Sequence, residues 1–112
     1  MTVATFQSAQ VNLNVAASTP TVIGGYTVPA STAALITGGS VTNKSASAGT
    51  VSVTIWNGSS DIAYILYQQA IPAGATLFFA GADSKWTLGA GQGIRFTCTQ
   101  VADAVMGVMQ VA

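Results

Sequence analysis

Few side chains in this sequence could carry out chemistry. The chain has no histidine, and its acidic side chains are Asp61, Asp83 and Asp103. General acid–base catalysis usually relies on histidine or on paired carboxylates with tuned pKa values. The three aspartates are well separated, and each lies in or near a predicted turn, so we expect them to bond to their own backbone there. They could also converge on a calcium ion, but no spaced Asp/Asn loop motif supports such a site.

Two other features resemble chemical motifs only superficially. Cys98 has no histidine to activate it as a nucleophile, and it alternates with Ile94 and Phe96, so we expect a small buried hydrophobic residue. The glycines of GAGQG (89–93) suggest a phosphate-binding loop, yet no Lys-Ser or Lys-Thr follows and a strand is expected next. The sequence therefore predicts no enzyme, no cofactor and no metal site.

Composition narrows the class of partner. Only 5% of the 112 residues are charged and the formal net charge is zero, whereas about 25% are charged in an ordinary soluble domain. A nearly neutral surface promotes association. The basic residues are Lys44, Lys85 and Arg95, too few and too scattered for nucleic acid. No apolar run reaches the about 20 residues of a membrane-spanning helix, so neither nucleic acid nor membrane is expected.

Three segments show the alternation of half-buried strands. In TVSVTIW (50–56) the aliphatic residues occupy one face and Ser and Thr the other, with Trp56 beside them. In GIRFTCTQV (93–101) Ile, Phe and Cys alternate with Arg and Thr. DIAYILYQ (61–68) has apolar residues on both faces, so we expect it to be covered on both sides.

Turn sequences separate these segments. They are SASAG (45–49), NGSSD (57–61), IPAG (71–74) and GAGQG (89–93), and the Asn-Gly pair favours a hairpin. The spacing predicts an all-β fold: a single-domain antiparallel β-sandwich of about eight strands covering residues 1–112. Residues 1–32 are less regular and could form an edge strand with a long loop, or an arm that reaches a neighbouring subunit.

The aromatic residues raise the question of a binding surface. Neighbours in a strand face opposite sides, so one ring of the Phe78–Phe79 pair should be exposed and mark an interface. The aromatic residues could form a ligand-stacking surface, as in sugar-binding sandwiches. The alternative is that Tyr64, Phe96 and the other ring of the Phe78–Phe79 pair fill the core.

The segment from Val41 to Val111 carries a recognisable series of structural motifs. A strand ends at Asn43 before a Ser/Ala/Gly turn, alternating and Tyr-containing strands follow, and IPAG introduces a short apolar strand. A Leu then precedes a Gly-rich turn and the last two strands. This pattern resembles small β-sandwich virion proteins of tailed bacteriophages, most of all capsid decoration (cement) proteins. The chain departs from it at Gln92, where such proteins often have an Asp that caps the turn.

The resemblance implies a jelly-roll-like, non-enzymatic homotrimer that decorates and stabilises a phage capsid by bridging major capsid subunits. It implies assembly in the cytoplasm of the bacterial host and a final place on the capsid surface of the virion. The residues that we expect at the contacts are Tyr26, Trp56, Phe79 and Trp86.

Two alternatives remain at this stage. Similar sandwiches occur in tail, head–tail and fibre proteins of phages, which would be present in few copies per particle. A carbohydrate-binding module is the other alternative, with Asp61, Asn57 and Gln68 as the polar residues that would orient a sugar.

Overall fold

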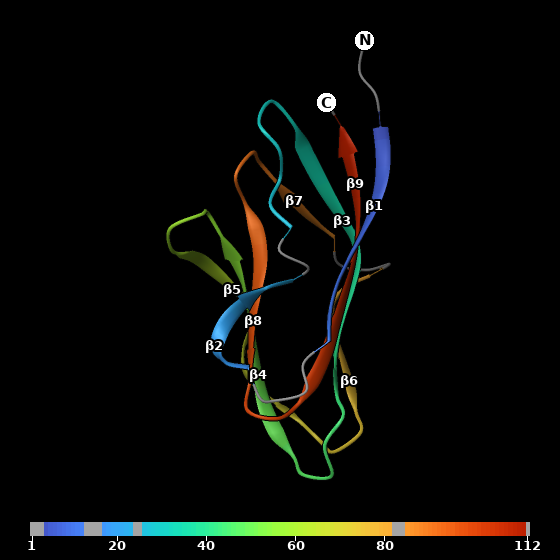
Figure 1. Ribbon diagram of the computed structural model, residues 1–112, viewed down its shortest axis with the longest axis vertical. Helices are drawn as coiled ribbons and strands as arrows, with labels where there is room; N and C mark the ends of the chain where they lie inside the picture. Colours follow the sequence, from blue (N-terminus) through green and yellow to red (C-terminus); the bar gives the residue numbers. More distant parts are fainter. Residues whose placement is uncertain (1–3, 13–16, 24–25, 82–84, 112) are drawn as a thin grey trace.

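The computed structural model describes residues 4–12, 17–23, 26–81 and 85–111. These residues form nine strands, which Figure 1 shows as two facing layers. The strands are β1 (Ala4–Asn12), β2 (Ala17–Val22), β3 (Ala33–Asn43), β4 (Gly49–Trp56), β5 (Asp61–Ile71), β6 (Thr76–Ala80), β7 (Trp86–Leu88), β8 (Gly93–Cys98) and β9 (Ala102–Val111).

The strand order is that of a jelly roll. One sheet has the order β1-β9-β3-β6, with β7 also paired to β3, and the other has the order β2-β8-β4-β5. Because β6 and β7 follow one another along β3, they share one position, and the described strands fill eight positions in two four-position sheets. Every pairing is antiparallel. The predicted single-domain antiparallel β-sandwich is confirmed.

The core lies between the two sheets and follows the alternation in the sequence. β9 buries every second side chain from Ala102 to Val108, and β8 buries Ile94, Phe96 and Cys98 while Arg95 and Thr97 face outward. This agrees with the predicted faces of β8. Tyr64, which the sequence offered as a core residue, is instead 56% exposed.

Strand β5 contradicts the prediction that it is covered on both sides. It is an edge strand paired only with β4 among the described strands, and its residues are exposed apart from Ile65, Leu66 and Ile71. Three register shifts interrupt the β4–β5 pairing, and Gln68 has a φ of 45°. Bulges twist a strand and turn side chains outward, so the apolar residues of both parities face solvent.

The N-terminal segment forms two strands within the sandwich. β1 pairs with β9 from Ala4 to Asn12, and β2 pairs with β8. Residues that looked irregular in the sequence therefore extend one edge of each sheet (Figure 1). Two statements stay predictions: that this segment is an arm that reaches a neighbouring subunit, and that the domain covers residues 1–112.

Two turns are held by side-chain amide oxygens that accept hydrogen bonds from backbone N–H groups. In the β4–β5 hairpin, the Asn57 Oδ1 accepts from the backbone N–H groups of Ser59 and Ser60, at 2.9 and 2.8 Å. In the turn before β8, the Gln92 Oε1 accepts from the Gly89 N–H at 2.8 Å. Gln92 thus bonds within the turn that an Asp was expected to cap, and the departure from the phage pattern leaves the turn intact.

Candidate interaction surfaces

Two of the three carboxylates that could have formed a catalytic or metal site, Asp61 and Asp103, form ion pairs with basic residues distant in the sequence. The Asp61 Oδ1 accepts from the Arg95 Nη2 at 2.8 Å, the Arg95 Nε at 3.0 Å and the Thr54 Oγ1 at 2.7 Å. Asp103 on β9 lies 3.2 Å from the Lys44 Nζ. Their bonding to cations replaces the expected bonding to their own turns, and Asp83 lies outside the described residues.

The described residues contain no group of three His, Cys, Asp or Glu side chains that could hold a metal ion. They also contain no helix that is long and apolar enough to cross a membrane. Cys98 is fully buried with a free thiol, which confirms the expectation of a small buried hydrophobic residue.

Three of the four expected contact residues are partly buried, each held by a different group. The Tyr26 hydroxyl donates to the Gln110 Oε1 at 2.5 Å, and burial raises the pKa of this phenol. The Trp86 Nε1 donates to the Phe79 carbonyl at 2.6 Å and so ties β7 to β6. The Arg95 guanidinium lies 5.2 Å from the centroid of the Trp56 ring, within the range of a cation–π contact.

Phe79, the fourth expected contact residue, lies in the core. It is only 2% exposed, whereas Phe78 is 74% exposed. One ring of the pair is exposed as predicted, but the exposed ring is Phe78, because Phe79 faces the opposite sheet. We therefore transfer the proposed contact from Phe79 to Phe78. Contacts of Tyr26, Trp56 and Trp86 with a partner stay predictions.

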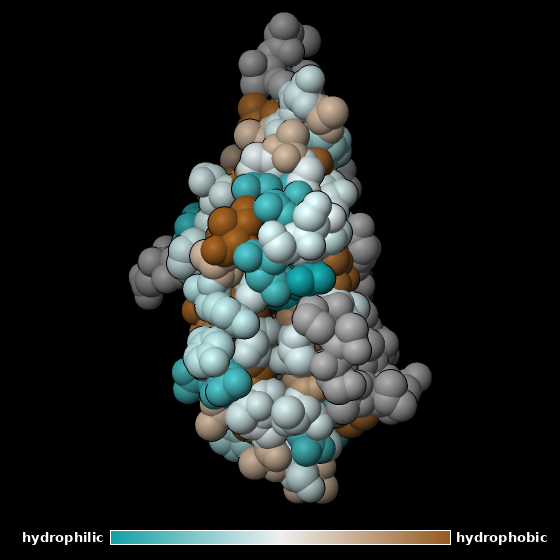
Figure 2. Space-filling model, turned by 90° about the vertical axis from the view of Figure 1, so that its left-hand side faces the viewer, coloured by the Kyte–Doolittle hydropathy of each residue, from teal (hydrophilic) through white to brown (hydrophobic). Residues whose placement is uncertain are grey.

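Among the side chains that the structure describes, the large exposed apolar ones occupy two surfaces. The first, which we call the β5 patch, consists of Ile62, Tyr64 and Tyr67, exposed at 53%, 56% and 62%. The two tyrosine rings meet edge to face with centroids 4.7 Å apart, an arrangement that aromatic pairs prefer. On the side of the molecule where β2 and β5 lie, Figure 2 shows hydrophobic atoms next to strongly hydrophilic ones.

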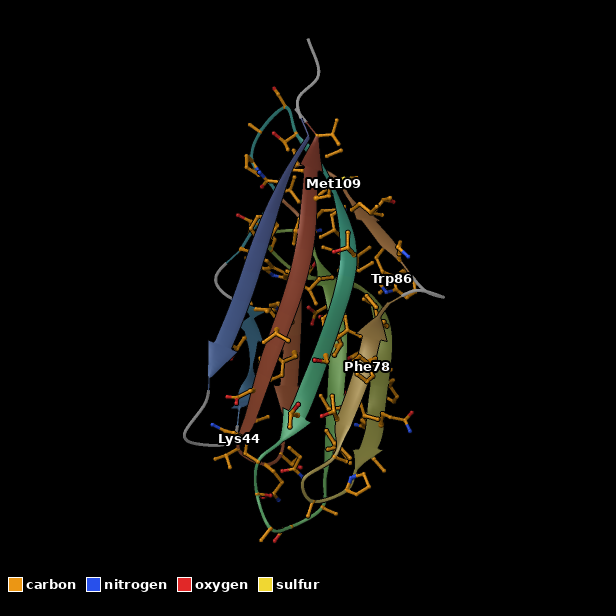
Figure 3. The ribbon with its side chains drawn as sticks, turned by 90° about the vertical axis from the view of Figure 1, so that its right-hand side faces the viewer. Lys44, Phe78, Trp86 and Met109 are labelled. Carbon is orange, nitrogen blue, oxygen red and sulfur yellow. The ribbon has the colours of Figure 1, made fainter. Side chains whose placement is uncertain are left out.

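The second surface is the outer face of the sheet β1-β9-β3-β6, which Figure 3 shows. On this face Phe78 of β6 and Val105 of β9, the latter 46% exposed, lie on either side of Ser40 of β3. This surface was not predicted from the sequence. The one local signal for it is the pair Gly38-Gly39 within the β3 strand pattern, since paired glycines in a strand mark a bulge or a close backbone approach.

The polar residues expected to orient a sugar are only partly available. The Asn57 Oδ1 is used within its own turn, and the Asp61 Oδ1 is shared by Arg95 and Thr54. Gln68 is exposed beside the tyrosine pair. Carbohydrate binding stays a prediction.

Comparison with known proteins shows a similar fold in solved structures but assigns the chain to no family. No protein-family model matches the chain, and no curated protein matches it. Among solved structures, a chain of the infectious bursal disease virus Gx strain has a TM-score of 0.54 and 10% identity; the match covers 96% of this chain and 32% of that chain. The likeness shows the fold. The present chain corresponds to about a third of that viral chain.

Two further solved structures are similar. The virus-like particle of the extra small virus of the prawn Macrobrachium rosenbergii gives a TM-score of 0.48 at 12% identity, covering 98% of this chain and 79% of that chain. The acid-stable capsid of Helicobacter pylori bacteriophage KHP30 gives a TM-score of 0.45 at 10% identity, covering 100% of this chain and 92% of that chain.

Proposed function

We propose that this chain is a non-enzymatic structural protein of a virion, which decorates a phage capsid and stabilises it by bridging major capsid subunits. The jelly-roll fold is compatible with this role but also serves many others. The observation that carries the proposal is the β5 patch. Large exposed apolar patches on a small domain mark interaction sites.

The chemistry of the β5 patch fits a protein partner. From Ile62 to Ile71 the strand has no charged side chain, and aromatic residues with few charges are typical of the centre of an interface. The three register shifts of β5 disfavour the addition of another strand to this edge. The partner would therefore contact the Tyr64 and Tyr67 rings, whereas extension of the sheet is disfavoured.

Charge also supports a role within an assembly. The ion pairs Lys44–Asp103 and Arg95–Asp61 neutralise four of the six charged side chains of the chain. A surface with so little charge has weak protection against association, and this is no disadvantage for a protein that is bound to a shell. Many modest contacts around a closed shell then add up to strong attachment.

The test is binding to capsids assembled without this protein. The purified chain should cosediment with such capsids, and the double variant Tyr64→Ser/Tyr67→Ser should bind at least about thirtyfold more weakly, as expected when hot-spot residues are removed. Gln69→Ser is the matched control, since Gln69 is exposed on the same strand, and it should bind like the wild type. Failure of the wild type to bind capsids would refute the proposal.

A tail or head–tail accessory protein is the remaining virion alternative. It predicts binding to tail or connector complexes and few copies per particle. The trimeric state expected from the phage resemblance is part of the proposal and is tested by the same purified material.

A further inference from the structure

The outer face of the sheet β1-β9-β3-β6 has a notch at its centre. The notch is the position of Gly38 on β3, which has no side chain; its register partner on β9 is Gly107, beside which the Thr37 hydroxyl lies. A Cβ atom added at Gly38 would meet no described atom within 4 Å, whereas one at Gly107 would lie 2.9 Å from the Thr37 Oγ1. Gly38 also has no positive φ.

Nothing within the described chain therefore requires glycine at position 38. Glycine in a strand interior destabilises the strand relative to alanine, and it often marks a site where another backbone or a ligand comes close. A partner outside the chain is a physical reason for the missing side chain.

Apolar side chains border the notch on both sides. Two residues further along β3, Ser40 points to the same face, and Phe78 and Val105 lie on either side of it. On the other side, Leu35 and Met109 form a half-exposed pair in register. Figure 3 shows Phe78 and Met109 on this face, with Lys44 at the far end. The face therefore combines an exposed ring at Phe78 with a backbone position at Gly38 that has no side chain.

The size of the face suits a protein–protein contact. β3 has 11 residues, which at about 3.3 Å per residue gives roughly 36 Å. Four strand positions at about 4.8 Å give roughly 19 Å, so the face offers on the order of 700 Å². A standard interface takes about 800 Å² from each partner, and this face nearly supplies that area.

The near absence of charge on this face favours a partner surface that is also nearly uncharged. Among the outward-facing side chains described on β3, β6, β7 and β9, Asp103 is the charged one, and it is paired with Lys44 at the end of the face. A neutral face gains nothing from a charged partner and must desolvate the partner's charges. A second copy of this chain provides a matching neutral face.

We propose that this face binds a second copy of the chain, with the Phe78 ring of one copy packed on the notch at Gly38 of the other. Because the Phe78 side chain and the notch lie on the same face, two copies can each place Phe78 on the notch of the other. Alternatively, several copies can form a closed cyclic oligomer, in which the edge strand β6 of each copy contacts the face of the next. The inference deepens the proposed function, on which it rests for the expected trimeric state, by naming the surface between copies; its test needs no capsid.

The experiment is the mass of the purified chain measured by light scattering over a concentration series. The wild type should be larger than a monomer, and its mass gives the number of copies. Gly38→Val fills the notch and Phe78→Ser removes the ring. Each variant should raise the dissociation constant of self-association at least about thirtyfold. The urea midpoint of Gly38→Val should stay at or above that of the wild type.

The control Tyr67→Ser changes an exposed ring of the other sheet and should leave the mass unchanged. A wild type that stays monomeric at about 100 µM, where even a micromolar contact would be nearly saturated, would overturn the inference. So would variants with normal folding that keep the wild-type mass. Loss of capsid binding with intact self-association would refute the proposed function alone.

Discussion

The side chain of Asn43 joins two turns at one end of the sandwich. It is fully buried, and its Oδ1 accepts from the Ser45 N–H and the Ser45 hydroxyl, both at 2.9 Å. Its Nδ2 donates to the carbonyls of Ser47 at 2.9 Å and of Ile71 and Pro72 at 3.3 Å. Asn43→Ala would remove all of these bonds at once.

The expected cost follows from burial. A buried polar group left without a partner costs about 1–3 kcal/mol. The carbonyl of the fully buried Ile71 loses a donor, and the part-buried bonds to Ser47 and Pro72 are lost with it. We expect Asn43→Ala to lower the free energy of unfolding by about 3 kcal/mol or more, a large part of the roughly 5–15 kcal/mol of a typical domain. Asn43→Asp keeps the shape but replaces the donor by a carboxylate facing carbonyl oxygens, so it should cost at least as much at neutral pH.

Asn57 offers a matched control. Its Oδ1 also accepts two hydrogen bonds in a turn, but it is exposed, so water can replace the lost bonds. Asn57→Ala should cost about 0.5–1 kcal/mol. With a urea m-value of about 1–3 kcal/mol/M, the midpoint should fall by about 1–3 M for Asn43→Ala and by less than about 1 M for Asn57→Ala. Equal shifts for the two variants would refute the reasoning from burial.

Three further predictions concern other positions. Gly39→Ala would place a Cβ atom within 2.8 Å of three atoms of the Phe79 ring, so it should cost about 1–3 kcal/mol; in the double variant, measured by urea unfolding, Phe79→Leu should recover part of that loss. Burial raises the pKa of Tyr26 above that of an exposed phenol, so ionisation in the unfolded chain should lower stability as the pH rises above about 10; Tyr26→Phe should show a smaller loss between about pH 8 and pH 11. Cys98 is buried, so a thiol reagent should react with it only as fast as the chain unfolds, and rapid reaction in native buffer would contradict the core packing.

Local patterns in the sequence predicted much of the fold. The alternation in 93–101 placed Ile94, Phe96 and Cys98 on the inner face, and the Asn-Gly pair predicted the β4–β5 hairpin. Both signals depend on neighbouring residues alone. The strand order depends on contacts between distant segments, and β1 and β2 could not be assigned to opposite sheets from their composition.

The candidate surfaces were harder to predict, because the face to which a side chain points depends on register. Three register shifts in the β4–β5 pairing put Tyr64 and Tyr67 in solvent, although their spacing suggested opposite faces. Phe78 and Phe79 were correctly predicted to face opposite sides, but only the pairing of β6 with β3 decides which ring is buried. The Gly38-Gly39 pair is a local signal of a close backbone approach, but the pairing of Gly38 with Gly107 on β9 depends on register between distant segments.

The most direct test of the central claim is the number of copies of this chain in purified virions, measured by quantitative mass spectrometry against the major capsid protein. The account predicts a copy number comparable with that of the major capsid protein, and capsids without the chain that fall apart more readily on heating. Absence from virions, or a few copies per particle associated with the tail, would contradict it.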